Sequence, residues 1–144
     1  METKPIFNYT GYGWEGGKYR TNQNLSITEI AKEIRKELKA YFPKCIFSVV
    51  CQKYSGGRSL HINLMHAPFN PFINPESKSE QFNHYCSDKE SKIFTPNAVT
   101  AMKTVTRIAN AFNFDDSDGM IDYSHTNFYL HLSVGKWDKP FIKD

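Results

Sequence analysis

The stretch that decides the fold runs from Ser26 to Met65 and reads SITEIAKEIRKELKAYFPKCIFSVVCQKYSGGRSLHINLM. Its first part predicts a helix, because Ser26 and Glu29 form a capping box before an apolar stripe with helical spacing. The stripe consists of Ile27, Ile30, Ala31, Ile34, Leu38 and Tyr41. Pro43 ends the helix, since a proline disfavours the helical conformation at the residue before it.

Two strands joined by a tight hairpin follow this helix. Residues 47–52 and 60–65 alternate between apolar and polar side chains, the pattern of strands that are buried on one face only. Gly56 and Gly57 lie between the strands and supply the positive-φ positions that a tight hairpin needs. The apolar side chains would face the helix, so the polar side chains would line an open face of the sheet.

A second helix and a third strand complete the pattern. Thr95 and Pro96 are typical of the N-cap and the first residue of a helix, and an apolar stripe follows through Phe112. Alternation over residues 128–134 predicts a further strand. The prolines and polar residues of 66–95 predict a long loop.

These elements predict an α+β chain in the order α-β-β-α-β. The simplest arrangement is a two-layer sandwich, in which an antiparallel sheet of three or more strands carries two helices on one face. We expect a single domain over residues 1–144. Its parts are an aromatic and glycine-rich arm (1–25), a helix plus hairpin (26–65), a loop insertion (66–95) and a final helix, acidic loop and strand (96–144).

Length and composition exclude several classes of protein. The chain has 144 residues and a net charge of +3, from 18 basic and 15 acidic side chains, and it contains 11 Phe and 8 Tyr. A collagen, a coiled coil and a disulfide-dense miniprotein are excluded. No apolar run approaches the roughly 20 residues of a membrane span, and residues 1–5 begin no secretory signal. Three cysteines without a CxxC pair favour free thiols. We therefore expect a cytoplasmic protein with no membrane partner.

The distribution of charge favours a nucleic-acid contact. Residues 1–60 carry ten basic and five acidic side chains, whereas residues 61–144 carry eight and ten. No acidic residue lies between Glu37 and Glu76, and a hairpin tip with two glycines can approach a phosphate backbone closely. The alternative interpretation is a solvated surface. The predicted contact surface joins the hairpin to the open face: Lys53, Tyr54, Ser55, Gly56, Gly57, Arg58, His61, Asn63, Tyr129 and His131.

The sequence supports a metal site less than it supports a nucleic-acid contact. His61 and His131 would need a third ligand such as His84 or Cys86 from the loop insertion, and no spacing typical of a metal site supports that set. The acidic stretch offers four further candidates: Asp115, Asp116, Asp118 and Asp122. A calcium loop that started at Asp116 would place Asn127 where a bidentate glutamate is needed, so the pattern fails.

Catalytic motifs are absent from the sequence. No phosphate-binding loop, dinucleotide fingerprint or nucleophile elbow occurs. We therefore expect no cofactor and name no catalytic residue. An enzyme that uses a metal ion held between Asp115 and Asp122 stays an alternative.

Several short motifs resemble the LPD29 domain, one of the domains described as large polyvalent protein associated. The motifs are ITEIAKEIRKELK (27–39), FSV (47–49), YSGG (54–57), FDDSDGMIDY (114–123) and NFY (127–129). The resemblance covers about residues 20–135, apart from the loop insertion. It implies a protein of phages or conjugative elements that occurs beside DNA-processing or host-modifying modules, and it implies no catalytic residue.

Two further functional hypotheses follow from these observations. The leading one is a binding or adaptor module of a mobile genetic element, without enzymatic activity, that contacts nucleic acid or a protein of the host or the element. The alternative is an inhibitor that binds a protein of a host defence system.

Overall fold

The computed structural model describes residues 10–11, 13–83, 87–117, 120 and 125–143. Helix α1 spans Ile27–Tyr41, and the Ser26 side chain accepts a hydrogen bond from the Glu29 N–H (3.2 Å). Ser26 is therefore confirmed as the N-cap of the helix. The predicted stripe is buried except for Tyr41, which lies in the last turn, is 58% exposed and packs its ring on Phe42.

The hairpin joins β2 (Ile46–Tyr54) to β3 (Gly57–Ala67) in antiparallel register. Tyr54 pairs with Gly57, so the turn consists of two residues only. Gly57 has a φ of 147°, whereas Gly56 has no positive φ. The expectation that both glycines need this conformation was wrong, because one such residue is enough to close the turn.

The sheet is mixed, and the prediction of an antiparallel sheet was wrong on this point. Strand β6 (Tyr129–Val134) runs parallel to β3 beside it. The connection between these strands includes helix α3 (Pro96–Asn110). Such a crossover carries the chain back to the end of the sheet at which β3 began, so β6 runs in the same direction as β3. The strand order is β2-β3-β6-β4, and β7 (Ile142–Lys143) also pairs with β3.

The segment 66–95 contains regular structure that the loop prediction missed. Strand β4 (Glu80–Phe82) pairs with β6 at the edge of the sheet, and helix α2 (Ser87–Ile93) follows it. Three buried phenylalanine rings tie the segment to the core: Phe72, Phe82 and Phe94. A strand of three residues is too short to show a periodicity, which explains why the sequence pattern did not indicate it.

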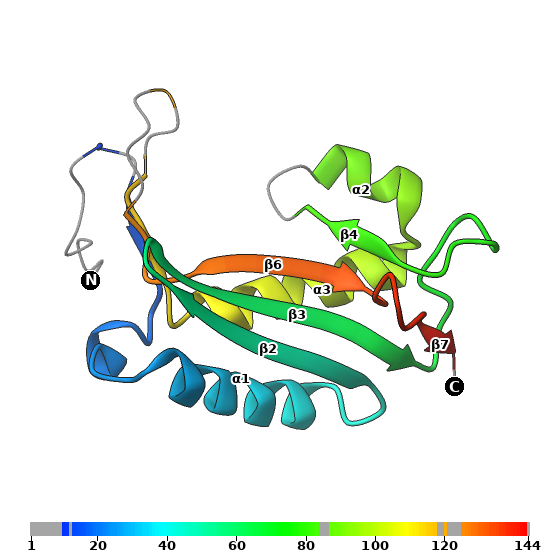
Figure 1. Cartoon of the computed structure of the whole chain (residues 1–144). Coiled ribbons are helices and arrows are strands. Elements are labelled where there is room, and N and C mark those ends of the chain that lie inside the picture. The colour runs from blue at the N-terminus through cyan, green and yellow to red at the C-terminus, as the bar shows by residue number, and fades with distance from the viewer. Residues whose placement is uncertain (1–9, 12, 84–86, 118–119, 121–124, 144) are drawn as a thin grey trace.

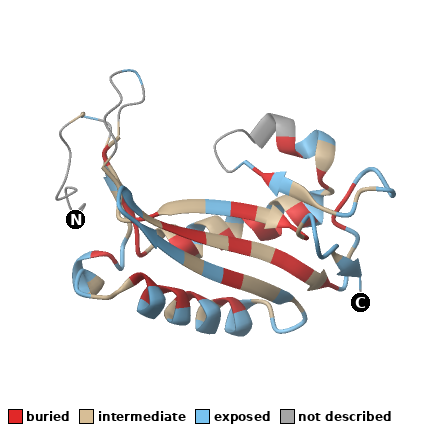
Figure 2. Ribbon diagram, in the orientation of Figure 1, coloured by how far each residue is buried: buried red, intermediate tan, exposed pale blue. Residues whose placement is uncertain are grey.

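Helices α1 and α3 cover one face of the sheet and contact each other (Figure 1). Figure 2 shows buried residues along the helices and the central strands, and the buried residues of β3 include Leu60, Ile62 and Leu64. The fold is therefore α+β with both predicted helices on one face, as expected. Thr95 precedes α3 as predicted, but its hydroxyl donates to the Asn70 carbonyl (2.7 Å) and does not cap the helix.

The end of the sheet at the hairpin carries a small ribbon. Strand β1 (Trp14–Glu15) pairs with β5 (Phe114–Asp115), and a 3-10 turn, η1 (Arg20–Asn22), leads from this ribbon toward α1. The aromatic and glycine-rich arm therefore contributes a short strand to the structure. Among the described residues, no helix is both long enough and apolar enough to cross a membrane.

Candidate binding face

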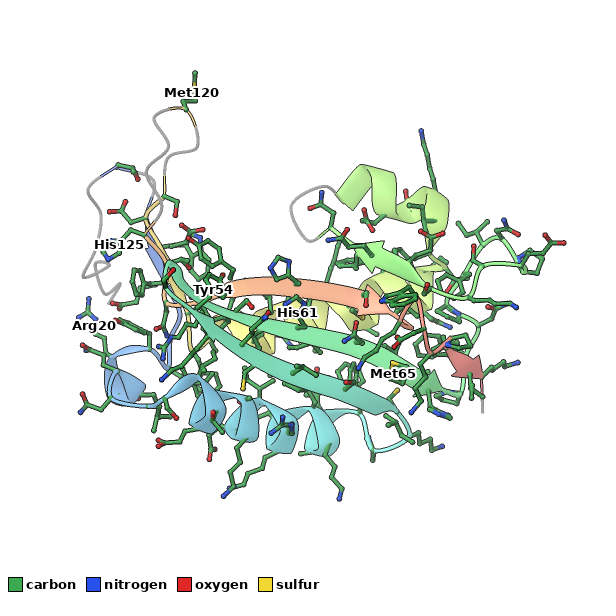
Figure 3. The ribbon with its side chains drawn as sticks, viewed as in Figure 1. Arg20, Tyr54, His61, Met65, Met120 and His125 are labelled. Carbon is green, nitrogen blue, oxygen red and sulfur yellow. The ribbon has the colours of Figure 1, made fainter. Side chains whose placement is uncertain are left out.

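The candidate site is the face of the sheet opposite the helices, which we call the open face. Strand register aligns its side chains in three rows: Gln52–Ser59–Tyr129, Val50–His61–His131 and Ser48–Asn63–Ser133. The middle row lies at the centre of the sheet, where Figure 3 labels His61. The sequence prediction that His61, Asn63, Tyr129 and His131 share one face is consistent with this register.

His61 and His131 form a stacked pair at the centre of the open face. Their ring centroids are 4.5 Å apart and the rings are tilted by only 17°. Burial lowers the pKa of His61 below its ordinary value of 6.5, and the nearby His131 lowers it further. The Ser59 hydroxyl lies 3.4 Å from His61 Nε2. The open face therefore presents a pair of flat rings with an uncharged His61 at neutral pH.

A groove of about 700 Å³ opens over this histidine pair. Residues from four strands (β2, β3, β4 and β6) and from the chain after β6 line it, and the aromatic and amide side chains among them are Gln52, His61, Asn63, Gln81, His131 and Trp137. A second hollow of about 350 Å³ lies along the part of β6 that β4 does not cover. The two hollows share Gln81, His131 and Leu132 in their walls, so they adjoin at β6.

Two tyrosines extend the open face to the hairpin. Tyr54 is 47% exposed, and Figure 3 shows it at the hairpin end of the sheet. A Cβ on Gly57 would lie 3.2 Å from the Tyr129 ring and 3.9 Å from the Tyr54 ring. Both rings therefore flank this glycine, and the absence of a side chain there lets the Tyr129 ring lie against the strand.

At the basic hairpin, Arg58 has a partner within the fold that the sequence did not indicate. The Arg58 guanidinium donates to the Asn127 carbonyl (2.9 Å) and to its side-chain oxygen, so it anchors the start of β6. Lys53 alternates onto the helix side of β2 with Cys51, and Ser55 and Gly56 form the exposed turn. The tip therefore presents few cations, and sequence could not reveal this because Asn127 lies 69 residues from Arg58.

Comparison with known families identifies the central part of the chain. The model of the large polyvalent protein associated domain 29, LPD29, matches residues 25–101. The chain belongs to the LPD29 family. No curated protein and no solved structure matches the chain.

The matched part of the LPD29 domain includes α1, β2 and β3. It therefore includes His61 and Asn63, whereas the His131 half of the stacked pair lies beyond it. The family is associated with large polyvalent proteins.

The acidic residues beyond the matched part have local partners. Asp116 is buried, and one of its carboxylate oxygens accepts from the Thr10 N–H (2.9 Å) and hydroxyl (2.6 Å). Asp115 accepts from the Ser117 N–H (2.9 Å). Within the described part of the chain, no group of three His, Cys, Asp or Glu side chains is placed to hold a metal ion. The other proposed ligands lie outside the described residues: His84, Cys86, Asp118 and Asp122.

Gln81 and Trp137 line the groove, and the sequence prediction missed both. Gln81 lies in the three-residue strand β4, and Trp137 lies after β6, beyond the last predicted strand. The one available signal was a tryptophan between lysines outside any amphipathic element. An exposed ring in such a segment favours a contact over a core position.

The lowered pKa of His61 predicts how the stability of the protein depends on pH. Because the pKa of His61 is lower in the folded state, the unfolded chain binds the proton more readily. The free energy of unfolding therefore keeps its whole His61 contribution above pH 6.5 and decreases as the pH drops below that value. We expect chemical unfolding between pH 8 and pH 5 to show a smaller loss in His61→Gln than in the wild type. Equal losses would contradict this prediction.

Proposed function

We propose that this LPD29 domain is a binding module without enzymatic activity that contacts single-stranded nucleic acid through its open face. In this proposal it serves as an adaptor of a mobile genetic element. The observation that carries the proposal is the stacked His61–His131 pair in an open groove, with Tyr54 and Tyr129 on the same face of the sheet. Flat rings on an uncovered sheet are the surface on which unpaired bases stack.

The shape of the face favours a single strand over a duplex. The groove and the second hollow adjoin at β6, and Tyr129 lines the second hollow, so binding sites for successive bases lie side by side along the sheet. Stacking needs bases whose faces are free, and a duplex hides those faces between neighbouring base pairs. Each stacked base contributes about 1–3 kcal/mol, so two or three rings suffice for specific binding at low salt.

The charge around the groove sets the expected salt dependence. Lys136 lines the groove together with Glu80 and Asp138, so the groove itself carries no net positive charge. Few phosphate contacts are therefore available. We expect the logarithm of the binding constant to fall with the logarithm of salt concentration with a slope of about 1–2, since each phosphate contact on a single strand contributes about 0.7.

Binding of labelled oligonucleotides tests the proposal. Fluorescence anisotropy with a 20-nucleotide single strand and the matching duplex, each as DNA and as RNA, should give tighter binding of a single strand by at least about ten-fold. Tyr54→Ala should weaken this binding by about ten-fold, because it removes one stacking ring. Tyr41→Ala is the matched control, since Tyr41 is as exposed but lies at the end of α1. Absent binding, or equal binding of duplex and single strand, would overturn the proposal.

A protein partner is the second candidate, favoured by exposed apolar side chains along one strand. Ile46, Val50 and Tyr54 are all exposed on β2. Such a row suits the inhibitor of a host defence protein more than it suits an unpartnered surface. A pull-down from host lysate distinguishes the two, because a stoichiometric protein without nucleic acid would favour the inhibitor.

A further inference from the structure

The turn after β6 holds a tryptophan at the rim of the groove. Lys136 and Lys139 pair across this turn, with the Lys136 N–H on the Lys139 carbonyl (2.8 Å) and the Lys139 N–H on the Lys136 carbonyl (3.2 Å). Trp137 and Asp138 form its tip. We call these four residues the KWDK turn.

The KWDK turn is fixed to the sheet on both sides. Gly135 donates to the Leu64 carbonyl (2.8 Å) and Phe141 donates to the Lys78 carbonyl (3.0 Å). Gly135 has a φ of 72°, and a Cβ there would lie 2.5 Å from the Lys78 carbonyl oxygen. Only glycine fits this position, so the chain holds the turn close to β4 and over the groove.

Trp137 is the most exposed ring of the groove wall. It is 92% exposed and yet lines the groove together with His61 and His131. A tryptophan on a fixed turn exposes a large apolar ring without gaining burial, which is the arrangement expected of a contact residue. The position suits an aromatic ligand that enters the groove from this rim.

The two lysines of the turn point to an anion. Residues that pair directly across an antiparallel bridge have neighbouring side chains, and like charges there repel. Within the described residues, neither Lys136 nor Lys139 forms an ion pair. A phosphate bound beside Trp137 would relieve the repulsion and join both charges to one ligand.

We infer that the KWDK turn holds one nucleotide of a bound single strand, with the base stacked on Trp137 and a neighbouring phosphate on Lys136 and Lys139. Glu80 and Asp138 line the groove and repel phosphate, so the base enters the groove and the backbone stays at the lysine rim. This inference rests on the proposed function, which it deepens by naming the anchoring element.

The groove floor supplies groups that read the base edge. The Gln52 and Gln81 amides line the groove and make no hydrogen bond within the described part of the chain. An amide offers a donor and an acceptor side by side, which matches the donor–acceptor edges of unpaired bases. Asn63 is fixed nearby by the hydroxyl of Ser133.

Tryptophan fluorescence tests the stacking directly. The chain has two tryptophans, and Trp14→Phe leaves Trp137 as the single reporter. Titration with a single-stranded 20-mer should quench this emission. Trp137→Ala should weaken binding by about ten-fold, whereas Trp137→Phe should keep most of the affinity because it keeps a stacking ring. Circular dichroism should show the same fold in all three variants.

The lysines have a separate readout. The double variant Lys136→Ala/Lys139→Ala should lower the salt slope of binding by about 0.7, the value for the loss of one phosphate contact. A wild type that binds no oligonucleotide would overturn both the inference and the proposed function. A wild type that binds, with no Trp137 quenching and an unchanged affinity in Trp137→Ala, would overturn this inference alone.

Discussion

Replacing Phe94 with alanine is expected to lower the free energy of unfolding by about 4 kcal/mol. The Phe94 side chain is fully buried, and its ring centroid lies 5.6 Å from that of Phe82 and 5.9 Å from that of Phe72. The substitution removes the transfer free energy of the ring and leaves a cavity between the Phe72 and Phe82 rings.

Urea unfolding followed by circular dichroism measures this loss. Phe94→Leu should cost less, because it fills part of the cavity, and it keeps the comparison usable if the alanine variant does not fold. Ile73→Ala is the control, since Ile73 lies in the same segment with an exposed side chain, and it should change the stability by less than about 0.5 kcal/mol. A loss below about 1 kcal/mol in Phe94→Ala would mean that segment 66–95 does not pack as described.

Asn113→Asp is expected to cost about 3 kcal/mol, although the two side chains have nearly the same shape. The buried Asn113 amide donates through Nδ2 to the Phe128 carbonyl (3.1 Å) and to Asn110 Oδ1 (3.2 Å). Its Oδ1 accepts from the Phe114 N–H (3.0 Å) and the Phe128 N–H (3.1 Å). An aspartate would turn a charged oxygen toward the two acceptors. This amide therefore sets the position at which β6 begins, and with it that of the open face.

Unfolding at two pH values separates the charge from the shape in this variant. The loss should be smaller at pH 4 than at pH 8, because protonation removes the buried charge and restores a donor. Asn74→Asp is the matched control. Only the side-chain oxygen of Asn74 is used, to accept from the Glu76 N–H (3.0 Å), and aspartate keeps that oxygen. Equal losses in the two variants would contradict the role given to Asn113.

Local signals in the sequence were sufficient for the elements that depend on neighbours in the chain. The capping box at Ser26 and the alternation through β2 and β3 predicted these elements and the face on which their side chains lie. The direction of β6 relative to β3 was not predictable in this way, because it depends on the path of a long connection. Strand β4 was missed because three residues carry no period.

The candidate site was likewise predictable from the sequence only where it depends on local patterns. Alternation placed His61 and His131 on one face, and their contact then required only that the two strands be neighbours. Arg58 was expected to be a free cation, and its partner Asn127 is distant in sequence. Trp137 lines the rim of the groove because the turn that holds it depends on Gly135. No periodic pattern in the sequence indicates such a turn.

The central claim is that the open face, and no other surface, binds a single strand. Chemical-shift mapping of the ¹⁵N-labelled protein with a single-stranded 12-mer tests it most directly. The predicted result is that the amides of β3 and β6, the KWDK turn and the Trp137 indole N–H shift on titration, while those of α1 stay unchanged. Shifts confined to α1 or α3, or no shifts at all, would contradict the claim.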